Sequence, residues 1–411
     1  MLNKLPTGWQ QCCFEDVLDY EQPTKYIVKN TNYEDKGVAV LTAGKSFILG
    51  YTKETTGIFY GDKEPVIIFD DFTTSSKLVK FPFKVKSSAM KILHARDNIN
   101  IDFIYYLMQT ISYRNETHKR YWISEYAKQK LNLPPIEEQG RIVEKIEELF
   151  SDIDNGIKDL KTAQTQIKQY RQSVLKSAFE GKLYKTSEWK EVKLEDVCKF
   201  KSGTTIPKGL EHSNGDIPYV KVADMNLPDN KIAICTSSKF GILSELRESQ
   251  IIPISAVIFP KRGGAIATNK KRKVIKSIII DLNIMAIIPS EKITQNFLFY
   301  KMLSIDLMKL SNGGNIPQIN NYSFDDQKIL LPTLTEQQQI VAEIEKRFAV
   351  SDEVEKAVND SLLQAEKLKQ SILKQAFAGK LVPQNPNDEP AAVLLERIKA
   401  AKENSTKGKN K

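Results

Sequence analysis

The stretch 257–273, VIFPKRGGAIATNKKRK, carries residue types that contact DNA. Arg262 has the paired donors that read guanine in the major groove, and Asn269 has the amide that reads adenine. Gly263 and Gly264 lack a Cβ atom, so the backbone there can approach another chain or a phosphate closely. The pattern predicts a strand, a glycine turn, a short strand and a basic cluster that contact DNA; the alternative is a solvated hairpin.

Basic residues without acidic neighbours surround this turn. Residues 260–280 contain seven lysines and arginines and no aspartate or glutamate. Such cations hold DNA phosphates, and these contacts fix the register of a protein on the duplex without reading its sequence. The cations that we assign to DNA contact in this half of the chain are Lys208, Lys261, Lys270, Lys271, Arg272 and Lys273.

A second candidate set lies nearer the N-terminus, in DDFTTSSKLVKFPFKVKSS (70–88). It is predicted as a polar turn followed by lysines on a strand, and residues 72–96 hold six lysines and arginines and no acidic residue. The residues that we assign to DNA contact here are Thr73, Thr74, Ser75, Lys77, Lys84 and Lys86. Threonine and serine are also common on strands that have no function, so a solvated strand is the alternative.

Gly44-Lys45-Ser46 is the nearest approach to a phosphate-binding loop. That loop has the pattern G-x-x-x-x-G-K-[S/T] and precedes a helix whose first N–H groups meet the phosphate. Here Ala39 stands at the position of the first glycine, and the following FILGYT is predicted as a strand. We interpret the segment as a polar turn that presents Lys45 to DNA rather than as a nucleotide site.

The patterns that catalysis or metal binding would need are missing from the sequence. It has no glycine-rich S-adenosylmethionine loop and no Asn-Pro-Pro-aromatic or Asp-Pro-Pro-Tyr motif. The three histidines are widely spaced and the four cysteines form no CxxC pair, which argues against a metal site and suits a reducing cytoplasm. No apolar run is long enough to span a membrane. We therefore expect a cytoplasmic chain with no metal, no cofactor of its own and no membrane contact.

The elements that must position these residues are two copies of one long helix. The segment 133–183 begins LPPIEEQGRIVEKIEELF, and it recurs at 331–381, which begins LPTLTEQQQIVAEIEKRF. The offset is a constant 198 positions, and 21 of the 51 aligned residues are identical. Proline stands before each copy, and glycine ends it at Gly181 and Gly379, as at helix ends. In the first copy, apolar residues recur at alternating steps of four and three, which is typical of a coiled coil.

Two arrangements of these helices fit the pattern. A coiled coil between two molecules would make the chain a dimer, whereas a helix used twice in one chain favours an antiparallel pair within the molecule. We adopt the second interpretation because the duplication extends beyond the helices. The further matches, at offsets of 180 and 194, are those of Trp9 with Trp189, Phe103 with Phe297 and Tyr106 with Tyr300.

The predicted fold is α+β, with two sheet-rich domains, two long helices and a pseudo-twofold internal repeat. β-Branched and aromatic runs between turn residues predict the strands. We place the first domain at 1–132, the first long helix at 133–183, the second domain at 184–330 and the second long helix at 331–383. Residues 384–411 form a polar linker, a short helix and a lysine-rich tail. The formal net charge of +9 is concentrated outside the helices.

With two variable β-rich domains, each preceding a repeated LP-x-x-x-E-Q helix, the chain resembles the specificity subunit of type I restriction–modification systems. The helices carry the resemblance in LPPIEEQGRIV and LPTLTEQQQIV, in SVLKSAFEGKL and SILKQAFAGKL, and in the tail LVPQNPNDEPAAVLLERI. The domains carry it in VLTAGKSFILGYT, EWKEVKLEDVCKFKSGTTIP and VIFPKRGGAIATNKKR. The resemblance covers essentially the whole chain.

This resemblance implies a division of labour among subunits. Each domain would read one half of a split site on double-stranded DNA, and the helices would space the domains and dock two modification subunits. Those partners would bind S-adenosylmethionine and methylate adenine, and restriction subunits would use ATP and Mg²⁺ to translocate and cut DNA. The present chain would be non-catalytic. The residues that we assign to partner docking are the repeated Glu138, Gln139, Phe179, Glu336, Gln337 and Phe377.

A second interpretation belongs to another class of function. The chain would be a coiled-coil scaffold or decoy subunit that binds modification subunits without productive DNA recognition. The two basic segments outside the helices favour DNA recognition.

Overall fold

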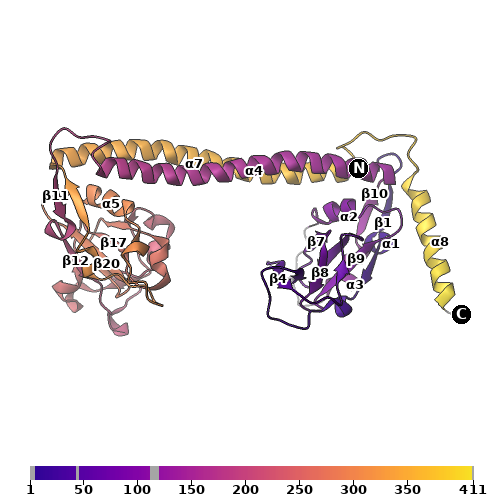
Figure 1. Cartoon of the computed structure of the whole chain (residues 1–411), viewed down its shortest axis with the longest axis horizontal. Coiled ribbons are helices and arrows are strands. Elements are labelled where there is room, and N and C mark those ends of the chain that lie inside the picture. Colours follow the sequence, from indigo (N-terminus) through magenta and orange to yellow (C-terminus); the bar gives the residue numbers. More distant parts are fainter. Residues whose placement is uncertain (1–4, 43–45, 112–119, 410–411) are drawn as a thin grey trace. The chain divides into compact units, whose positions relative to one another are not determined.

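The computed structural model describes residues 5–42, 46–111 and 120–409, with side chains up to residue 403 except that of Lys208 (Figure 1). It divides into two compact units, the first made of 1–159 with 361–411 and the second of 160–360. Each unit holds one sheet-rich domain and part of each long helix. The predicted α+β fold is confirmed.

The two long helices are α4 (Ile136–Phe179) and α7 (Leu334–Phe377), of 44 residues each. At 1.5 Å per residue each is about 66 Å long. The glycines that follow them, Gly181 and Gly379, have φ of +71° and +66°. This left-handed conformation ends a helix and is open to glycine without steric cost. One long helix in each repeat is therefore confirmed.

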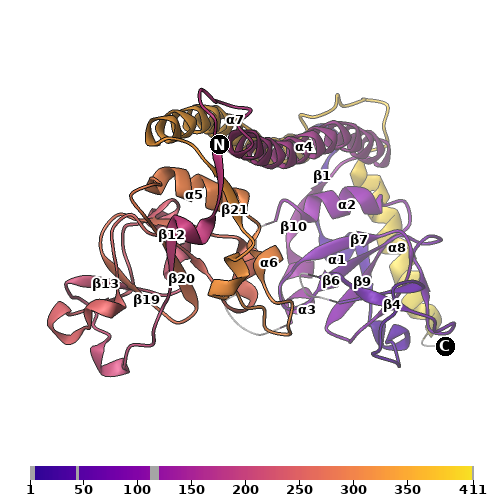
Figure 2. The same ribbon diagram turned by 60° about the vertical axis from the view of Figure 1, so that its left-hand side comes forward.

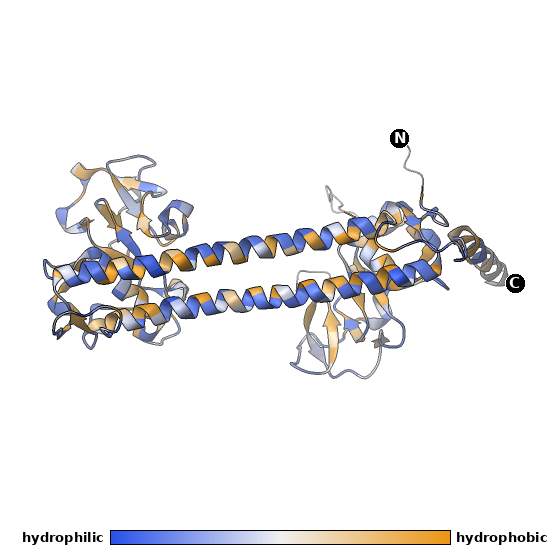
Figure 3. Cartoon of the chain, turned by 90° about the horizontal axis from the view of Figure 1, so that it is seen from above, coloured by the Kyte–Doolittle hydropathy of each residue, from blue (hydrophilic) through white to orange (hydrophobic). Residues whose placement is uncertain are grey.

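Ion pairs and hydrogen bonds fix the antiparallel pairing of α4 with α7. In the first unit Lys369 pairs with Asp154 over 2.5 Å. In the second, Arg171 pairs with Asp352 over 2.5 Å, and the Gln164 amide donates to the Asn359 side chain over 2.7 Å. A step forward along α4 thus corresponds to an equal step backward along α7, and Figure 3 shows hydrophobic residues recurring along both helices. The pairing is intramolecular, as predicted.

The domain of the first unit contains two four-stranded sheets, ordered β2-β9-β6-β7 and β4-β3-β8-β5, and a two-stranded sheet of β1 with β10. Its strands are β1 (Gln10–Cys13), β2 (Leu18–Glu21), β3 (Val38–Leu41), β4 (Ile48–Thr52), β5 (Phe59–Tyr60), β6 (Val66–Asp70), β7 (Ser76–Val79), β8 (Pro82–Val85), β9 (Met90–Ala95) and β10 (Lys130–Leu133). Its helices are α1 (Phe14–Val17), α2 (Ile101–Met108) and α3 (Tyr121–Ser124).

The domain of the second unit has a five-stranded sheet ordered β12-β20-β17-β18-β14, a four-stranded sheet ordered β15-β13-β19-β16, and a pair of β11 with β21. Its strands are β11 (Lys190–Lys193), β12 (Cys198–Ser202), β13 (Ile217–Val220), β14 (Ala233–Ile234), β15 (Lys239–Gly241), β16 (Ile251–Ile252), β17 (Val257–Pro260), β18 (Arg272–Val274), β19 (Ile278–Ile280), β20 (Ile284–Pro289) and β21 (Lys328–Leu331). Its helices are α5 (Gln295–Ser304) and α6 (Leu307–Leu310), and its 3₁₀ segments include η4 (Lys208–Leu210) and η9 (Gly263–Thr268).

The two-stranded sheets bring the start of each domain beside the start of a long helix. Gln10 of β1 lies opposite Leu133 of β10, and Lys190 of β11 lies opposite Leu331 of β21. Because β10 leads into α4 and β21 leads into α7, both domains close on their long helix in the same way.

Each main core joins a domain to the start of one long helix and the end of the other. The residues that α4 and α7 give to the first core are Ile142, Val143, Ile146, Ile372, Leu373 and Ala376. The repeat-equivalent residues in the second core are Ile340, Val341, Ile344, Val174, Leu175 and Ala178. Figure 2 shows α2 in the first unit and α5 in the second lying between the long helices and the sheets. We call α2 and α5 the domain helices.

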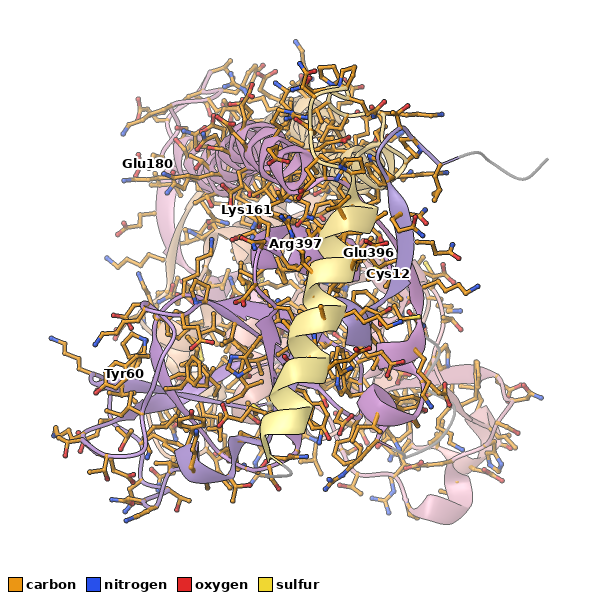
Figure 4. The ribbon with its side chains drawn as sticks, turned by 90° about the vertical axis from the view of Figure 1, so that its right-hand side faces the viewer. Cys12, Tyr60, Lys161, Glu180, Glu396 and Arg397 are labelled. Atoms are coloured by element: carbon orange, nitrogen blue, oxygen red, sulfur yellow. The ribbon has the colours of Figure 1, made fainter. Side chains whose placement is uncertain are left out.

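The C-terminal helix α8 (Ala391–Lys409) has no counterpart after α4 and is longer than the short helix that we predicted. Ala391, Leu394 and Ile398 bury their side chains in the first core. Cys12 and Glu396, which Figure 4 labels, both line a hollow of about 620 Å³ between β1 and α8. Among the described residues, no helix is long and apolar enough to cross a membrane.

Candidate nucleic-acid interface

The basic glycine turn at the end of β17 lies beside a loop that sequence reasoning missed. Ile319 donates its backbone N–H to the Lys261 carbonyl over 2.9 Å, and Gly263 donates to the Pro317 carbonyl over 2.8 Å. Arg262 and Gln318 form an isolated antiparallel bridge. The loop 311–318, SNGGNIPQ, therefore lies alongside the turn. Its glycine pair was the sequence signal that could have predicted a second turn.

Both segments are open to an approaching molecule. Arg262 and Gly264 are exposed, and Ile316 is 62% exposed. A Cβ atom added at Gly263 or Gly264 would meet no described atom within 4 Å, and Gly263 has φ of +70°. The fold itself leaves the space above this backbone open, as a close contact with another chain requires.

The two glycines and the four residues after them form the 3₁₀ segment η9, where we predicted a turn and a short strand. Asn269 ends this segment with φ of +53°. Its side-chain oxygen accepts from the Leu307 backbone N–H over 2.9 Å and from the Lys271 ammonium over 2.7 Å. The prediction that Asn269 reads adenine is wrong, because this oxygen is already used inside the domain.

Lys271 is likewise an interior residue. Its side chain is 1% exposed, and its ammonium donates to Asn269 and to the Ile305 carbonyl, each over 2.7 Å. Burial lowers the pKa of Lys271 to about 7. Arg272 is half-buried and donates to the carbonyls of Lys271 and Met225. The predicted phosphate contact of Lys271 is therefore wrong, and the terminal nitrogens of Arg272 are bound internally.

The other predicted cations of this half of the chain lie in different environments. Lys261 donates to the Ser202 hydroxyl over 2.8 Å, and burial lowers its pKa. Lys273 donates to Asn296 over 3.1 Å. Lys270 is half-buried and reaches the Asn226 side chain. Lys208 lies in η4, and its side chain is not among those described. Arg262 and Lys270 remain the predicted contacts with the least internal engagement.

In the first unit, the predicted polar turn connects β6 to β7. Asp70 donates its N–H to the Ser75 carbonyl over 2.8 Å, and Thr74 donates to the Asp70 carbonyl over 2.9 Å. The Thr73 hydroxyl reaches the Asp70 carboxylate. The side chains of this set that are exposed, and for which DNA contact stays a prediction, are Thr73, Ser75, Lys77 and Lys86. Thr74 has φ of +59° and is half-buried.

The prediction for Lys84, in the same domain, is corrected by the structure. Its side chain is 2% exposed, and its ammonium donates to the carbonyls of Thr56 and Gly57 over 2.7 and 2.9 Å. It also pairs with Glu54 over 3.1 Å. The prediction of a DNA contact for Lys84 is wrong, because its ammonium group is buried and makes all three contacts inside the domain. Lys45, predicted as a DNA contact, lies outside the described residues.

The glutamates assigned to partner docking bind within the chain. Glu138 and Glu336 are 1% and 4% exposed. Trp9 donates its indole N–H to Glu138 over 3.1 Å, and Trp189 donates to Glu336 over 3.3 Å. Each glutamate therefore holds the start of a domain against the start of a long helix.

The neighbouring glutamines, Gln139 and Gln337, are fully buried. The Gln139 side-chain oxygen accepts from the Asn100 N–H over 3.0 Å, and that of Gln337 accepts from the Thr294 N–H over 2.8 Å. Asn100 and Thr294 are the N-cap residues of α2 and α5. Each glutamine thus holds the start of a domain helix.

Phe179 and Phe377 also pack against the domain helices. Phe179 meets Phe297 of α5 with ring centroids 5.2 Å apart, and Phe377 meets Phe103 of α2 at 5.3 Å, both edge to face. The predicted docking role is wrong for the four Glu and Gln residues, since burial removes them from any partner. The two phenylalanines have their contacts within the chain's own cores.

The two repeated glutamates differ in electrostatic surroundings. Burial raises the pKa of Glu138 above its ordinary value. Hydrogen bonds from Ser187 and Thr186 hold the pKa of Glu336 well below its ordinary value. Residues 186 and 187 precede Trp189 in the second repeat, so the second carboxylate has more donors than the first. Among the described residues, no group of three His, Cys, Asp or Glu side chains is placed to hold a metal ion.

Comparisons with known proteins agree on one family. The family model described as "Type I restriction modification DNA specificity domain" matches residues 6–162 and 186–364. The EcoR124I/EcoR124II specificity subunit of Escherichia coli is 33% identical over 360 residues, which cover 80% of this chain and 84% of that protein. The EcoKI specificity subunit of Escherichia coli K12 is 26% identical over 302 residues, 65% of this chain and 63% of that protein.

Two solved structures show the same fold. One is a chain from work on complex assembly and conformational transition of the type I R-M system, with a TM-score of 0.72. It is 19% identical, and the match covers 92% of this chain and 100% of that chain. The HsdS subunit of Thermoanaerobacter tengcongensis has a TM-score of 0.51 and 19% identity, over 92% of this chain and 99% of that chain.

Proposed function

The chain belongs to the family of type I restriction–modification specificity subunits, which implies DNA sequence recognition, and from this we propose that it reads a split DNA site. Each sheet-rich domain reads one half-site, and the antiparallel helices set the gap between the halves. Two readers in one chain make the second contact intramolecular, which raises affinity without any new contact.

The observation that carries this proposal is that both domains join the long helices through the same contacts. In each, a tryptophan at the domain start binds the repeated glutamate, and the N-cap of the domain helix binds the repeated glutamine. A duplicated attachment of two diverged domains fits two readers that share one frame and differ in the sequence they read.

We assign base reading in the second domain to the turn at Arg262 and the adjoining loop with Gln318. Arginine reads guanine and glutamine reads adenine by paired hydrogen bonds. Lys270 contacts a phosphate beside them. In the first domain, Thr73, Ser75, Lys77 and Lys86 take the corresponding roles.

Partner docking belongs to outward-facing parts of the long helices, in place of the buried residues first assigned to it. In the second unit, Tyr170, Val350 and Val354 are 46%, 59% and 46% exposed, so a partner that covers them buries apolar surface. We propose that modification subunits cover such positions. S-adenosylmethionine, ATP and Mg²⁺ belong to the modification and restriction subunits, and the present chain is a non-catalytic part of a cytoplasmic complex.

Methylome sequencing tests the proposal. The chain is expressed with its modification subunit in a host that lacks other adenine methyltransferases, and we expect methylation of one two-part sequence motif. Replacing residues 1–132 by the corresponding domain of another member should change one half of that motif only. The control lacks this chain and should show no such motif.

Two results would contradict the proposal. Alteration of both halves would exclude one reader per domain. A modification subunit that copurifies with the chain yet methylates no motif would favour the scaffold or decoy function, which the burial of Lys84 and Lys271 makes worth testing.

A further inference from the structure

A tyrosine, a phenylalanine and an arginine from three helices stack together in the second unit. Tyr300 of α5 meets Phe348 of α7 edge to face, with ring centroids 5.8 Å apart. The Arg171 guanidinium of α4 lies 5.9 Å from the same Phe348 ring. The Tyr300 hydroxyl also donates to Glu345 of α7 over 3.2 Å. One ring of α7 thus contacts both the domain helix and the other long helix.

The first unit repeats this arrangement at the equivalent positions. Tyr106 of α2 meets Phe150 of α4 edge to face at 5.8 Å. The Lys369 ammonium of α7 lies 5.0 Å from the Phe150 ring and pairs with Asp154 over 2.5 Å. The two tyrosines match at an offset of 194, and the other residues match at 198. We call each arrangement the Tyr–Phe–cation stack.

The stack lies at the opposite end of the domain's attachment from the glutamine contact. In the second unit, Gln337 holds the N-cap residue of α5, Thr294, and Phe348 contacts Tyr300 further along the same helix. The two points on α7 are eleven residues apart, which is about 16 Å along the axis. The domain is also held by Trp189 and by the Phe179–Phe297 contact. A tilt of α5 about its N-cap nevertheless requires the Tyr300–Phe348 contact to break.

We propose that the Tyr–Phe–cation stacks are positioning elements that fix the tilt of each domain on the helix pair and thereby restrict the chain to one gap between half-sites. This inference rests on the proposed function. One added base pair moves a half-site by about 3.4 Å along the duplex. It also turns that half-site by about a tenth of a helical turn. A domain that cannot tilt rejects such a site, and a domain released from its stack accepts it more readily.

The two stacks differ in strength. Arg171 pairs with Asp352 over 2.5 Å and with Glu355 over 2.8 Å, whereas Lys369 pairs, within the described part of the chain, with Asp154 alone. The residue equivalent to Glu355 in the first repeat is Ile157, which carries no charge. Arginine also presents a planar fork to carboxylates, which lysine does not. The stack of the second unit is therefore the more rigid one.

Binding to a set of DNA duplexes tests the inference. The chain in complex with its modification subunits is titrated onto duplexes that carry the methylome-defined half-sites with the native gap, one base pair less or one base pair more. Tyr300→Leu and Tyr106→Leu remove the domain side of each stack. For each variant, we expect the ratio of the Kd for a shifted gap to the Kd for the native gap to fall at least fivefold. The affinity for the native gap should fall by a smaller factor.

The arginine variants separate the stack from the helix pair. Arg171→Gln should relax the gap preference, and Arg171→Lys, which copies Lys369, should retain most of it. Gln164→Ala is the matched control, because Gln164 binds Asn359 between the same two helices and is assigned no contact with the domain. Its Kd ratio should remain that of the parent.

Three results would overturn the inference. The first is an unchanged Kd ratio in both tyrosine variants when their near-UV circular dichroism spectra match that of the parent. The second is a Kd ratio that falls as much in Gln164→Ala as in the tyrosine variants. The third is an equal loss of affinity of the tyrosine variants for all three duplexes. Should a leucine variant unfold, Arg171→Gln, which removes the cation and keeps both rings, decides by the same ratio. A parent that prefers no gap contradicts the proposed function itself, whereas a selective parent with selective variants contradicts only this inference.

Discussion

Trp9 donates its indole N–H to the carboxylate of Glu138 over 3.1 Å, although 129 residues separate the two in sequence. Trp189 and Glu336 repeat the contact in the second unit, where Thr186 and Ser187 add further donors to the carboxylate. The repeated Glu-Gln dipeptide at the start of each long helix is therefore an internal attachment point, although its recurrence first suggested a docking face.

This difference in donors predicts unequal effects of removing the two indoles. Trp9→Phe leaves the buried Glu138 with fewer donors, and an unsatisfied buried polar group costs about 1–3 kcal/mol. Trp189→Phe should cost less, because Glu336 keeps its bonds to residues 186 and 187. Chemical unfolding of both variants measures the two losses of stability, and a larger loss for Trp189→Phe would contradict this prediction.

The same two glutamates predict opposite contributions to stability as the pH changes. The folded pKa of Glu336 lies below the unfolded value near 4.3, so its contribution is complete above that value and is lost as the pH falls through the folded pKa. The folded pKa of Glu138 is raised, so its contribution favours folding at low pH and is lost as the pH rises through the folded pKa.

Glutamine substitutions test these signs. Glu336→Gln should destabilise most at neutral pH and make the loss of stability below pH ~5 less steep. Glu138→Gln should be milder at neutral pH, because a neutral amide there avoids burying a charge. Unfolding midpoints between pH 3 and 8 measure both, and parallel curves for the two variants would refute the assignment.

Sequence reasoning located the long helices and most strands because both follow from local patterns. The steps of four and three in 133–183 predict α4, and the β-branched run PVIIF predicts β6. The pairing of the helices within one chain followed from the repeat itself. The glycine pair of the loop 311–318 marks a turn, but it does not show which distant strand the loop adjoins, so the place of this loop beside Arg262 was missed.

The same reasoning failed for single charged residues. Lys84 and Lys271 lie in basic runs, yet their ammonium groups bind carbonyls inside the domains. Composition reveals that a run is basic but not which members face inward. Strand alternation would not have found them either, because β8 buries Phe83, Lys84 and Val85 in succession and Lys271 lies just before β18. For Glu138, the signal was present in the matching offset of Trp9 and Trp189, but a repeated residue can bind its own chain as well as a partner.

The burial of Lys271 predicts that it contributes to stability and not to DNA affinity. Lys270→Gln removes a cation near the DNA face and should reduce the salt dependence of binding by about one unit of slope. Lys271→Met fills a similar volume but removes two internal hydrogen bonds, so it should lower stability and leave the slope unchanged. Titrations at several salt concentrations decide, and a slope that changes with Lys271→Met would restore it as a phosphate contact.

The register of α4 with α7 predicts how the gap between half-sites can be altered. Gln164 faces Asn359 in an antiparallel pair, so one heptad added after Gln164 and one added before Asn359 lengthen both helices and keep their pairing. Seven residues add about 10.5 Å, close to three base pairs at about 3.4 Å each. They complete nearly two helical turns, so the relative rotation changes by only about 20°. Methylome sequencing should show both half-sites unchanged and a longer gap. Insertion into α4 alone is the control, and we expect it to disturb the pairing and abolish methylation; an unchanged gap in the double insertion would show that the helices do not set it.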